Sequence, residues 1–286
     1  MNKKNIWLSI LVLGILLLAA YAFRINQIGF FDDEWLTLFV VKNKGISNLV
    51  YHYSFDRPLR GYFEAYLIAF FGTNMIHYQI LGLVLRIADT SIFFVILMTL
   101  FPKHIRNNLM ASAVMLIYPG FLQQYHAFDY QAQFFSHFAM MASFLISLFP
   151  IRFGKRWLYL TAIPLAIGLS LVSVGLMELY IGMEMFRFVM IFFAYRKYPP
   201  SNGGVWKSTL LYSLPYLVNA VGFSVWRIFF FESKRVTVST EGMLAEISSL
   251  GGLWQAFVDL LQNLFRQLIA VWYETVAYYL KFLQPN

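Results

Sequence analysis

The stretch PLRGYFEAYLIAFFG, residues 58–72, decides the fold of this chain, because every later segment changes side according to whether this stretch crosses a bilayer. Fifteen residues rise about 22 Å as an α-helix. The hydrocarbon core of a bilayer is about 30 Å thick. Length alone therefore leaves two alternatives, a short span or a helix that lies at the membrane surface.

Composition indicates that a membrane is the right setting. The chain is 59% hydrophobic and only 13% charged, with a mean hydropathy of +0.61, whereas a soluble domain carries roughly a quarter charged residues. We therefore predict an all-α, polytopic membrane protein. The net charge of +8 does not indicate a nucleic-acid partner, because Lys and Arg fall in short clusters between apolar runs.

About eight apolar runs are long enough to be read as spans. They lie at 6–23, 76–101, 108–122, 134–150, 157–175, 179–195, 208–230 and, less clearly, 262–282. The first run could be a signal peptide, since Ala20-Tyr21-Ala22 offers a small-x-small cleavage site. It is long for the apolar part of a signal peptide, and we predict an uncleaved first helix.

Basic residues decide how 58–72 is placed. Lys3 and Lys4 put the N-terminus in the cytoplasm. If 58–72 does not span, three basic loops all face the cytoplasm: PKHIRNN (102–108), RFGKR (152–156) and YRKYPP (195–200). If it spans, all three fall outside, against the positive-inside rule. The charges therefore predict a juxtamembrane helix on the extracytoplasmic face.

This topology implies a single transmembrane domain, residues 1–286, in the plasma membrane of the cell envelope. Residues 24–75 form a first extracytoplasmic loop and 231–261 a second. Pro58 lies in the first turn of the juxtamembrane helix. Arg60 and Glu64 are expected to point towards the lipid headgroups.

The first loop opens with FFDDEW, in which Asp32, Asp33 and Glu34 follow one another. A carboxylate at the outer membrane face can act as a general base or hold a divalent cation. The structural alternative is a solvated acidic turn at the exit of the first helix.

The segment HYSFDRPLRGYF, 52–63, is a candidate phosphate site. Guanidinium groups beside a helix N-terminus bind phosphate by bidentate hydrogen bonding and through the helix dipole. The side chains concerned are His52, Asp56, Arg57 and Arg60. Headgroup anchoring by arginine is the alternative.

The loop QQYHAFDYQAQ, 123–133, is expected on the same face and carries His126 and Asp129. Glu178, in a tight outer turn, is a further carboxylate there. Carboxylates and a histidine could together hold Mg²⁺ or Mn²⁺, although no metal is required by the pattern. An interfacial cap of Tyr and Gln is the alternative.

Two pairs of opposite charge fall inside predicted spans. Arg86 and Asp89, like Glu184 and Arg187, are three residues apart and so share a helix face. Charges at membrane depth face a bundle interior or a cavity. They are either structural pairs or the lining of a polar path, as in a transporter.

Four short motifs occur in an order that resembles the GT-C glycosyltransferases, in the branch of the protein O-mannosyltransferases and aminoarabinose transferases. They are Asp33-Glu34, Asp56-Arg57-Pro58-Leu59, Phe71-Gly72-Thr73-Asn74 and Arg86-Ile87. The resemblance covers roughly residues 1–100. MELYIGMEMFR, 177–187, resembles bacterial relatives more weakly.

The resemblance implies inverting transfer of a sugar from polyprenyl phosphate to a glycan, lipid or protein. Asp33 matches the family's catalytic carboxylate, with Asp32 as its rival, and Arg57 stands where the family has a phosphate-contacting lysine. Asp-Arg-Pro replaces Lys-Pro-Pro here. Family members are longer, so the resemblance also implies that a C-terminal part is missing. A transporter or flippase and a non-catalytic membrane partner are the alternatives.

Overall fold

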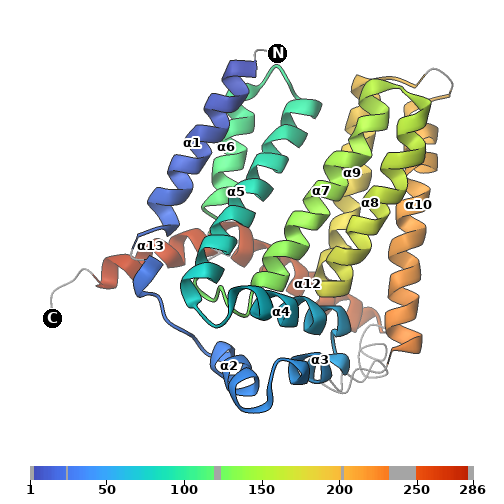
Figure 1. Cartoon of the computed structure of the whole chain (residues 1–286). Coiled ribbons are helices and arrows are strands. Elements are labelled where there is room, and N and C mark those ends of the chain that lie inside the picture. Colours follow the sequence, from blue (N-terminus) through green and yellow to red (C-terminus); the bar gives the residue numbers. More distant parts are fainter. Residues whose placement is uncertain (1–2, 24, 119–123, 201–202, 232–248, 283–286) are drawn as a thin grey trace. The chain divides into compact units, whose positions relative to one another are not determined.

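A computed structural model of the chain describes residues 3–23, 25–118, 124–200, 203–231 and 249–282 (Figure 1). Helices make up its regular structure, and no strand occurs among these residues, which confirms the all-α prediction. The chain divides into two compact units, Met1–Leu116 with Gln124–Glu232, and Ile117–Gln123 with Ser233–Asn286.

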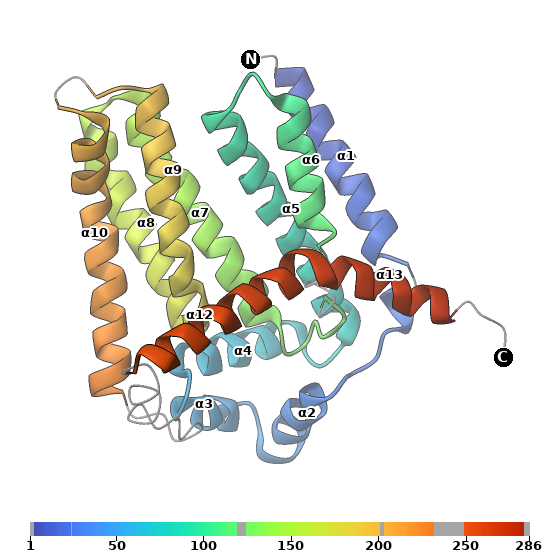
Figure 2. The ribbon, with the colours of Figure 1, turned by 180° about the vertical axis from the view of Figure 1, so that it is seen from behind.

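Seven helices of the first unit run roughly alongside one another and alternate in direction (Figures 1 and 2). They are α1 (Lys3–Tyr21), α5 (Met75–Leu100), α6 (Ile105–Leu116), α7 (Gln131–Phe153), α8 (Arg156–Leu176), α9 (Glu184–Lys197) and α10 (Val205–Val225). Three further helices lie at the end opposite the N-terminus. They are α2 (Asp33–Lys44), α3 (Ser47–Ser54) and α4 (Pro58–Phe71).

In the part of the chain that the structure describes, four segments are long and apolar enough to cross a membrane, which supports a membrane protein. They are Asn5–Gln27, Met75–Leu100, Gln131–Phe153 and Arg156–Leu176. The predicted number of about eight is not confirmed. Helix α6 has 12 residues and α9 has 14, both short of the roughly 20 residues that cross a hydrocarbon core.

Helix α4 covers the stretch 58–72 and runs crosswise to the long helices (Figure 1). It is not among the four candidate spans. Pro58 opens the helix, where its missing N–H costs no intrahelical hydrogen bond. Gly72 follows the last turn with φ 67°, a conformation that favours glycine. The position of this helix at the membrane surface stays a prediction.

The expected direction of Arg60 and Glu64 is wrong. Arg60 is 7% and Glu64 3% exposed. A charge buried in protein needs a partner, and the two side chains bond each other at 2.5 Å. The helix therefore turns these charges into the protein.

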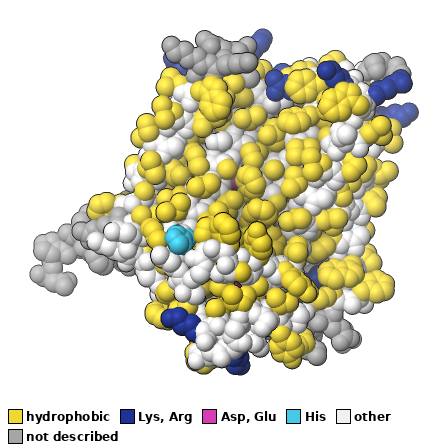
Figure 3. Space-filling model, viewed as in Figure 1, with side chains coloured by type: hydrophobic (Ala, Val, Ile, Leu, Met, Phe, Trp, Pro, Cys, Tyr) yellow, Lys and Arg dark blue, Asp and Glu magenta, His cyan; other side chains and the backbone are white. Residues whose placement is uncertain are grey.

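Basic side chains gather mainly at the end of the first unit that holds the N-terminus. The loops 101–104 and 154–155, together with residues 198–200 and 203–204, lie between successive helices there. Figure 3 shows Lys and Arg along this edge and a broad hydrophobic surface below it. Arg152 and Lys197 bond the hydroxyl and carbonyl of Thr99, near the C-terminal end of α5.

The two charge pairs inside the bundle differ. Arg187 and Glu184 form the predicted ion pair at 2.5 Å, and Arg187 is 1% exposed between the rings of Phe144 and Tyr216. Asp89 instead bonds His137 of α7 at 2.6 Å.

The second unit contains α12 (Leu250–Phe265) and α13 (Val271–Phe282), which a π-helical turn, Arg266–Ala270, joins. The sequence predicts that the second outer loop ends at residue 261 and that the last apolar run begins at 262. This boundary falls inside α12, so part of the expected loop and part of the expected span belong to one helix. Residues 232–248 of the expected second loop lie outside the described residues. Polar positions recur along α12 at Gln255, Asp259 and Gln262, and Arg266 follows at the start of the π-helical turn.

Candidate functional site

The acidic cluster splits into two exposed carboxylates and one buried carboxylate. Asp32 and Asp33 are exposed, whereas Glu34 is fully buried. Glu34 accepts hydrogen bonds from the backbone N–H groups of Phe31 at 2.8 Å, Phe128 at 2.8 Å and Asp129 at 3.3 Å. It therefore fastens the start of α2 to the loop before α7.

The environment of Glu34 is that of a structural carboxylate. Burial raises the pKa of Glu34, and the three backbone hydrogen bonds oppose that rise. Its oxygens are committed to backbone donors, so we assign Glu34 a positioning role beside the exposed pair.

Asp32 holds an unusual backbone conformation, φ 36° and ψ −116°. It is the one non-glycine residue with positive φ in the described part of the chain. Such a conformation costs on the order of 1–3 kcal/mol and persists only where the surroundings enforce it. The Glu34 bond to Phe31 N–H is one such restraint, because it closes the turn around Asp32.

The exposed pair lies beside the loop 124–130. The rings of Phe31 and His126 are 5.3 Å apart, and those of His126 and Tyr130 are 5.6 Å apart. Burial raises the pKa of Tyr130, and the negative charges of Asp129, Asp33 and Asp32 raise it further. These carboxylates are therefore close enough to Tyr130 to act on its hydroxyl electrostatically.

A buried network connects this loop to α4. Arg60 donates to the carboxylate of Asp129 at 2.7 Å and to its backbone carbonyl at 2.9 Å, and it stacks over the Tyr53 ring at 4.8 Å. Burial raises the pKa of Glu64 to about 7, although Arg60 opposes the shift. Arg60 and Asp129 therefore hold the loop in place, and Asp129 is not free to act alone.

Arg57, at the start of α4, faces the turn after α8. Its Nε and Nη2 donate to the two carboxylate oxygens of Glu178, each at 2.8 Å. Arg227 donates to the backbone carbonyl of Asp56 at 2.9 Å and to its carboxylate at 3.3 Å. Burial favours the neutral Glu178, but the hydrogen bonds and charge of Arg57 prevail and lower the pKa of Glu178.

These four charged side chains line a cavity of about 230 Å³. Pro58, Leu59, Val174, Gly175, Phe223 and Trp226 complete its wall. A Cβ on Gly175 would lie 3.0 Å from Leu59 Cδ2, tighter than ordinary van der Waals contact. A side chain at position 175 would therefore require the Leu59 side chain of α4 to shift.

Sequence reasoning missed two members of these networks as site residues, Arg227 and Glu64. Arg227 is the one charged residue in the apolar run 208–230. A charge in such a run indicates a functional or paired residue, so the sequence did contain a signal for it. Glu64 was assigned to the membrane surface. The partners of both residues come from distant segments, which local spacing cannot reveal.

Two other predicted residues lie apart from the cavity. His52 is exposed on α3, with its ring 5.2 Å from that of Tyr53. Arg86 is buried in α5, where it donates to Gln124 at 2.9 Å and to the Leu116 carbonyl at 3.1 Å. The buried environment indicates that Arg86 fixes helices and the loop rather than contacting a ligand in this cavity.

The described residues contain no group of three His, Asp or Glu side chains placed to share a metal ion. Gln123, in the loop expected to help, lies outside them. Among the described residues, the carboxylates and His126 therefore do not form a ligand set for Mg²⁺ or Mn²⁺.

Comparison of the chain with protein-family models, curated proteins and solved structures gives no match. The likeness to the GT-C glycosyltransferases therefore stands on the four sequence motifs.

Proposed function

We propose that this protein transfers a sugar from a polyprenyl-phosphate donor to an acceptor on the extracytoplasmic face. One observation carries the proposal. The strained Asp32 and its neighbour Asp33 lie exposed beside the loop 124–130, at the same end of the first unit as the cavity lined by Arg57 and Arg227. A base and a phosphate-binding group are the two parts that such a transfer needs.

Asp33 is the proposed general base, and Asp32 the alternative. The carboxylate takes the proton of the acceptor hydroxyl or amine while that atom attacks the anomeric carbon. The new bond to the sugar forms as the bond from the sugar to the phosphate oxygen breaks, and polyprenyl phosphate leaves with its electron pair. Attack opposite the leaving group inverts the anomeric centre.

Arg57 and Arg227 are the proposed partners of the phosphate. A planar guanidinium matches phosphate oxygens in bidentate geometry and stabilises the negative charge that develops on the leaving group. His126 and Tyr130, beside the acidic pair, are placed to contact the acceptor. Membrane lipids surround the protein, and no nucleic acid takes part.

The proposal includes the finer topology. The seven apolar runs of the first unit would cross the plasma membrane, α6 and α9 as parts of the longer runs 108–122 and 179–195, and the run 262–282 would supply the remaining span of about eight. The N-terminus and the basic loops would face the cytoplasm. Support comes from the gathering of Lys and Arg at one end and of the candidate site at the other.

The alternative function, transport through a polar path lined by the charges inside the bundle, has no comparable support. Glu184 and Arg187 are 5% and 1% exposed. Glu184 accepts from Ser170 at 2.6 Å, and Arg187 donates to Ser143 at 2.8 Å. A pair so enclosed and so fully bonded is a structural element of the bundle.

The test uses the full chain, purified and reconstituted in lipid, with a panel of radiolabelled polyprenyl-phosphate sugars. We expect at least one donor to lose its sugar to an acceptor or to water. Absence of turnover with every donor, in protein shown to be folded, would contradict the proposed enzyme and favour a lipid-handling partner.

A further inference from the structure

A buried network beneath the loop 124–130 joins two carboxylates to one cation. Arg60 of α4 donates to Glu64, on the same helix, at 2.5 Å and to Asp129, in the loop, at 2.7 Å. Among the described residues, Arg60 is the one cation that forms an ion pair with either carboxylate. With both carboxylates ionised, the network would therefore carry one negative charge more than Arg60 can balance.

The other groups that face Glu64 do not supply a balancing charge. They are Tyr53 of α3 and Tyr78 of α5, and a phenol is uncharged near neutral pH. Arg57, one turn earlier on α4, already donates to both carboxylate oxygens of Glu178. The excess negative charge therefore stays in the network unless a proton removes it.

The protein interior disfavours this excess charge. Glu64 is 3% exposed, and its Oε2 atom accepts no hydrogen bond among the described residues. An ionised oxygen without a donor is costly to bury. Burial and the charge of Asp129 together raise the pKa of Glu64 to about 7, against the opposing effect of Arg60. Glu64 is therefore the member of the network that takes up the proton.

We propose that Glu64 binds and releases a proton and thereby controls how firmly Arg60 holds the loop 124–130. With the proton bound, the charge of the guanidinium group is balanced by Asp129 alone. Loss of the proton returns a second carboxylate that competes for the same guanidinium group. Opening of the loop would take Asp129 away and admit water, and both changes favour the ionised form of Glu64. Proton binding and closure of the loop are therefore linked, so that each favours the other.

The loop connects this proton site to the exposed acidic pair. The backbone N–H groups of Phe128 and Asp129 donate to Glu34, and Glu34 closes the turn around Asp32. A loosened loop therefore relaxes a restraint on Asp32. Glu64 touches no reacting group in this arrangement and is a positioning residue. Its effect on sugar transfer rests on the proposed function, whereas its effect on the loop does not.

The experiment measures amide hydrogen exchange of the full chain in nanodiscs by mass spectrometry, at about pH 6 and about pH 8, on either side of the pKa of Glu64. The wild type is compared with Glu64→Gln, which keeps the shape of the side chain and stays neutral. Between the two pH values, exchange of the loop 124–130 should accelerate roughly tenfold more in the wild type than in Glu64→Gln. His126, in the same loop, is present in both proteins, so its contribution cancels.

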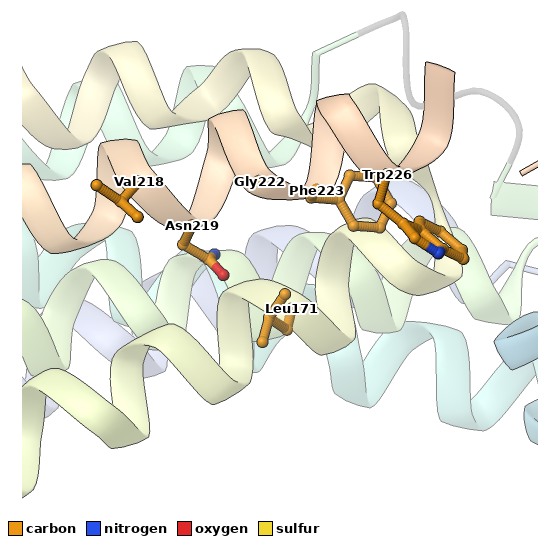
Figure 4. Close-up of a pocket in the computed structure, with 6 residues that line it drawn as sticks. All are labelled: Leu171, Val218, Asn219, Gly222, Phe223 and Trp226. Atoms are coloured by element: carbon orange, nitrogen blue, oxygen red, sulfur yellow. The ribbon is translucent and has the colours of Figure 1, made fainter. Parts of the chain in front are cut away.

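Two controls separate this response from general effects of pH. The segment 218–226 of α10 is the internal reference, because neither this segment nor the apolar groove that it lines against α8 contains a titratable side chain (Figure 4). Its exchange should change equally in both proteins. Glu274→Gln alters an exposed carboxylate of α13 and should leave the pH response of the loop 124–130 as it is in the wild type.

The same pH response of the loop in the wild type and in Glu64→Gln would overturn the inference. Faster exchange of the loop in Glu64→Gln than in the wild type at about pH 8 would also overturn it, because the ionised Glu64 would then hold the loop. The measurement needs no turnover. A loop that responds as expected in a protein that transfers no sugar would refute the enzyme and leave the proton site assigned, and sugar transfer without the loop response would do the reverse.

Discussion

Arg57 and Glu178 are 121 residues apart in the sequence and joined by two hydrogen bonds, each 2.8 Å long. The pair connects the start of α4 to the turn that follows α8. Both side chains are partly shielded from water, with 22% and 30% of their surface exposed. The same guanidinium therefore anchors the start of α4 and forms part of the proposed phosphate site.

The first prediction concerns the strength of this pair. A double-mutant cycle of Arg57→Ala and Glu178→Ala should give a coupling free energy of roughly 1 kcal/mol in thermal unfolding. Because Arg57 lowers the pKa of Glu178, the coupling should be present above about pH 4.5 and lost as the pH falls through the lowered pKa. Additive effects at neutral pH would show that the pair contributes nothing to the fold.

The second prediction concerns Glu64. Its folded pKa, about 7, lies above its ordinary value of 4.5, so the folded state binds the proton more tightly than the unfolded state. Stability from Glu64 should be full below about pH 4.5 and fall by roughly 1–3 kcal/mol as the pH rises to about 7. Glu64→Gln should remove this slope in chemical or thermal unfolding.

The control for Glu64 is the comparison with wild type at each pH, since other groups titrate in both proteins. Arg60, Asp129 and Tyr53 surround Glu64 and are unchanged in the variant. A wild type that gains stability over Glu64→Gln as the pH rises would mean that Arg60 keeps Glu64 ionised in the folded state.

The third prediction concerns the strained turn. Asp32→Gly removes the side chain from a residue with φ 36°, and should stabilise the fold by about 1 kcal/mol because glycine adopts positive φ without steric cost. Sugar transfer should fall if the carboxylate contributes to it. Loss of stability in Asp32→Gly, measured by the unfolding midpoint, would show that the side chain itself holds the turn.

The fourth prediction separates Glu34 from its neighbours. Glu34→Ala leaves three backbone N–H groups without their acceptor and should cost about 2–4 kcal/mol. Asp33→Ala changes an exposed side chain and should alter stability by less than about 0.5 kcal/mol. Equal unfolding midpoints for the two variants would contradict the positioning role of Glu34.

The fifth prediction uses the absence of cysteine from the sequence. Single cysteines introduced at Lys103 and Lys155 should react with a membrane-impermeant maleimide only after the cells are opened. Cysteines at Tyr51 and Tyr62, both exposed near the candidate site, should react in intact cells. Reaction of the basic loops in intact cells would reverse the proposed sidedness.

Sequence patterns predicted the features that depend on local composition. Apolar runs gave the helices of the bundle, and clustered Lys and Arg indicated the loops that meet at one end. Pro58 marked the start of α4. The i,i+3 spacing of Glu184 and Arg187 predicted a pair that the structure contains.

Features that depend on distant partners could not be predicted. The i,i+4 spacing of Arg60 and Glu64 shows that they share a helix face, but not that Asp129 covers it. Asp89 bonds His137 through a contact between two helices. Glu34 looked like its acidic neighbours, because only the folded loop supplies the amides of Phe128 and Asp129.

The most direct test of the central claim compares wild type, Asp33→Asn and Asp32→Asn in sugar transfer, with binding of the same polyprenyl-phosphate donor measured in parallel. Asparagine keeps the shape of the side chain and removes its ability to take a proton. We predict that Asp33→Asn loses transfer and keeps donor binding, while Asp32→Asn retains more activity. Full transfer activity in both variants would contradict the account, because neither exposed carboxylate could then be the base.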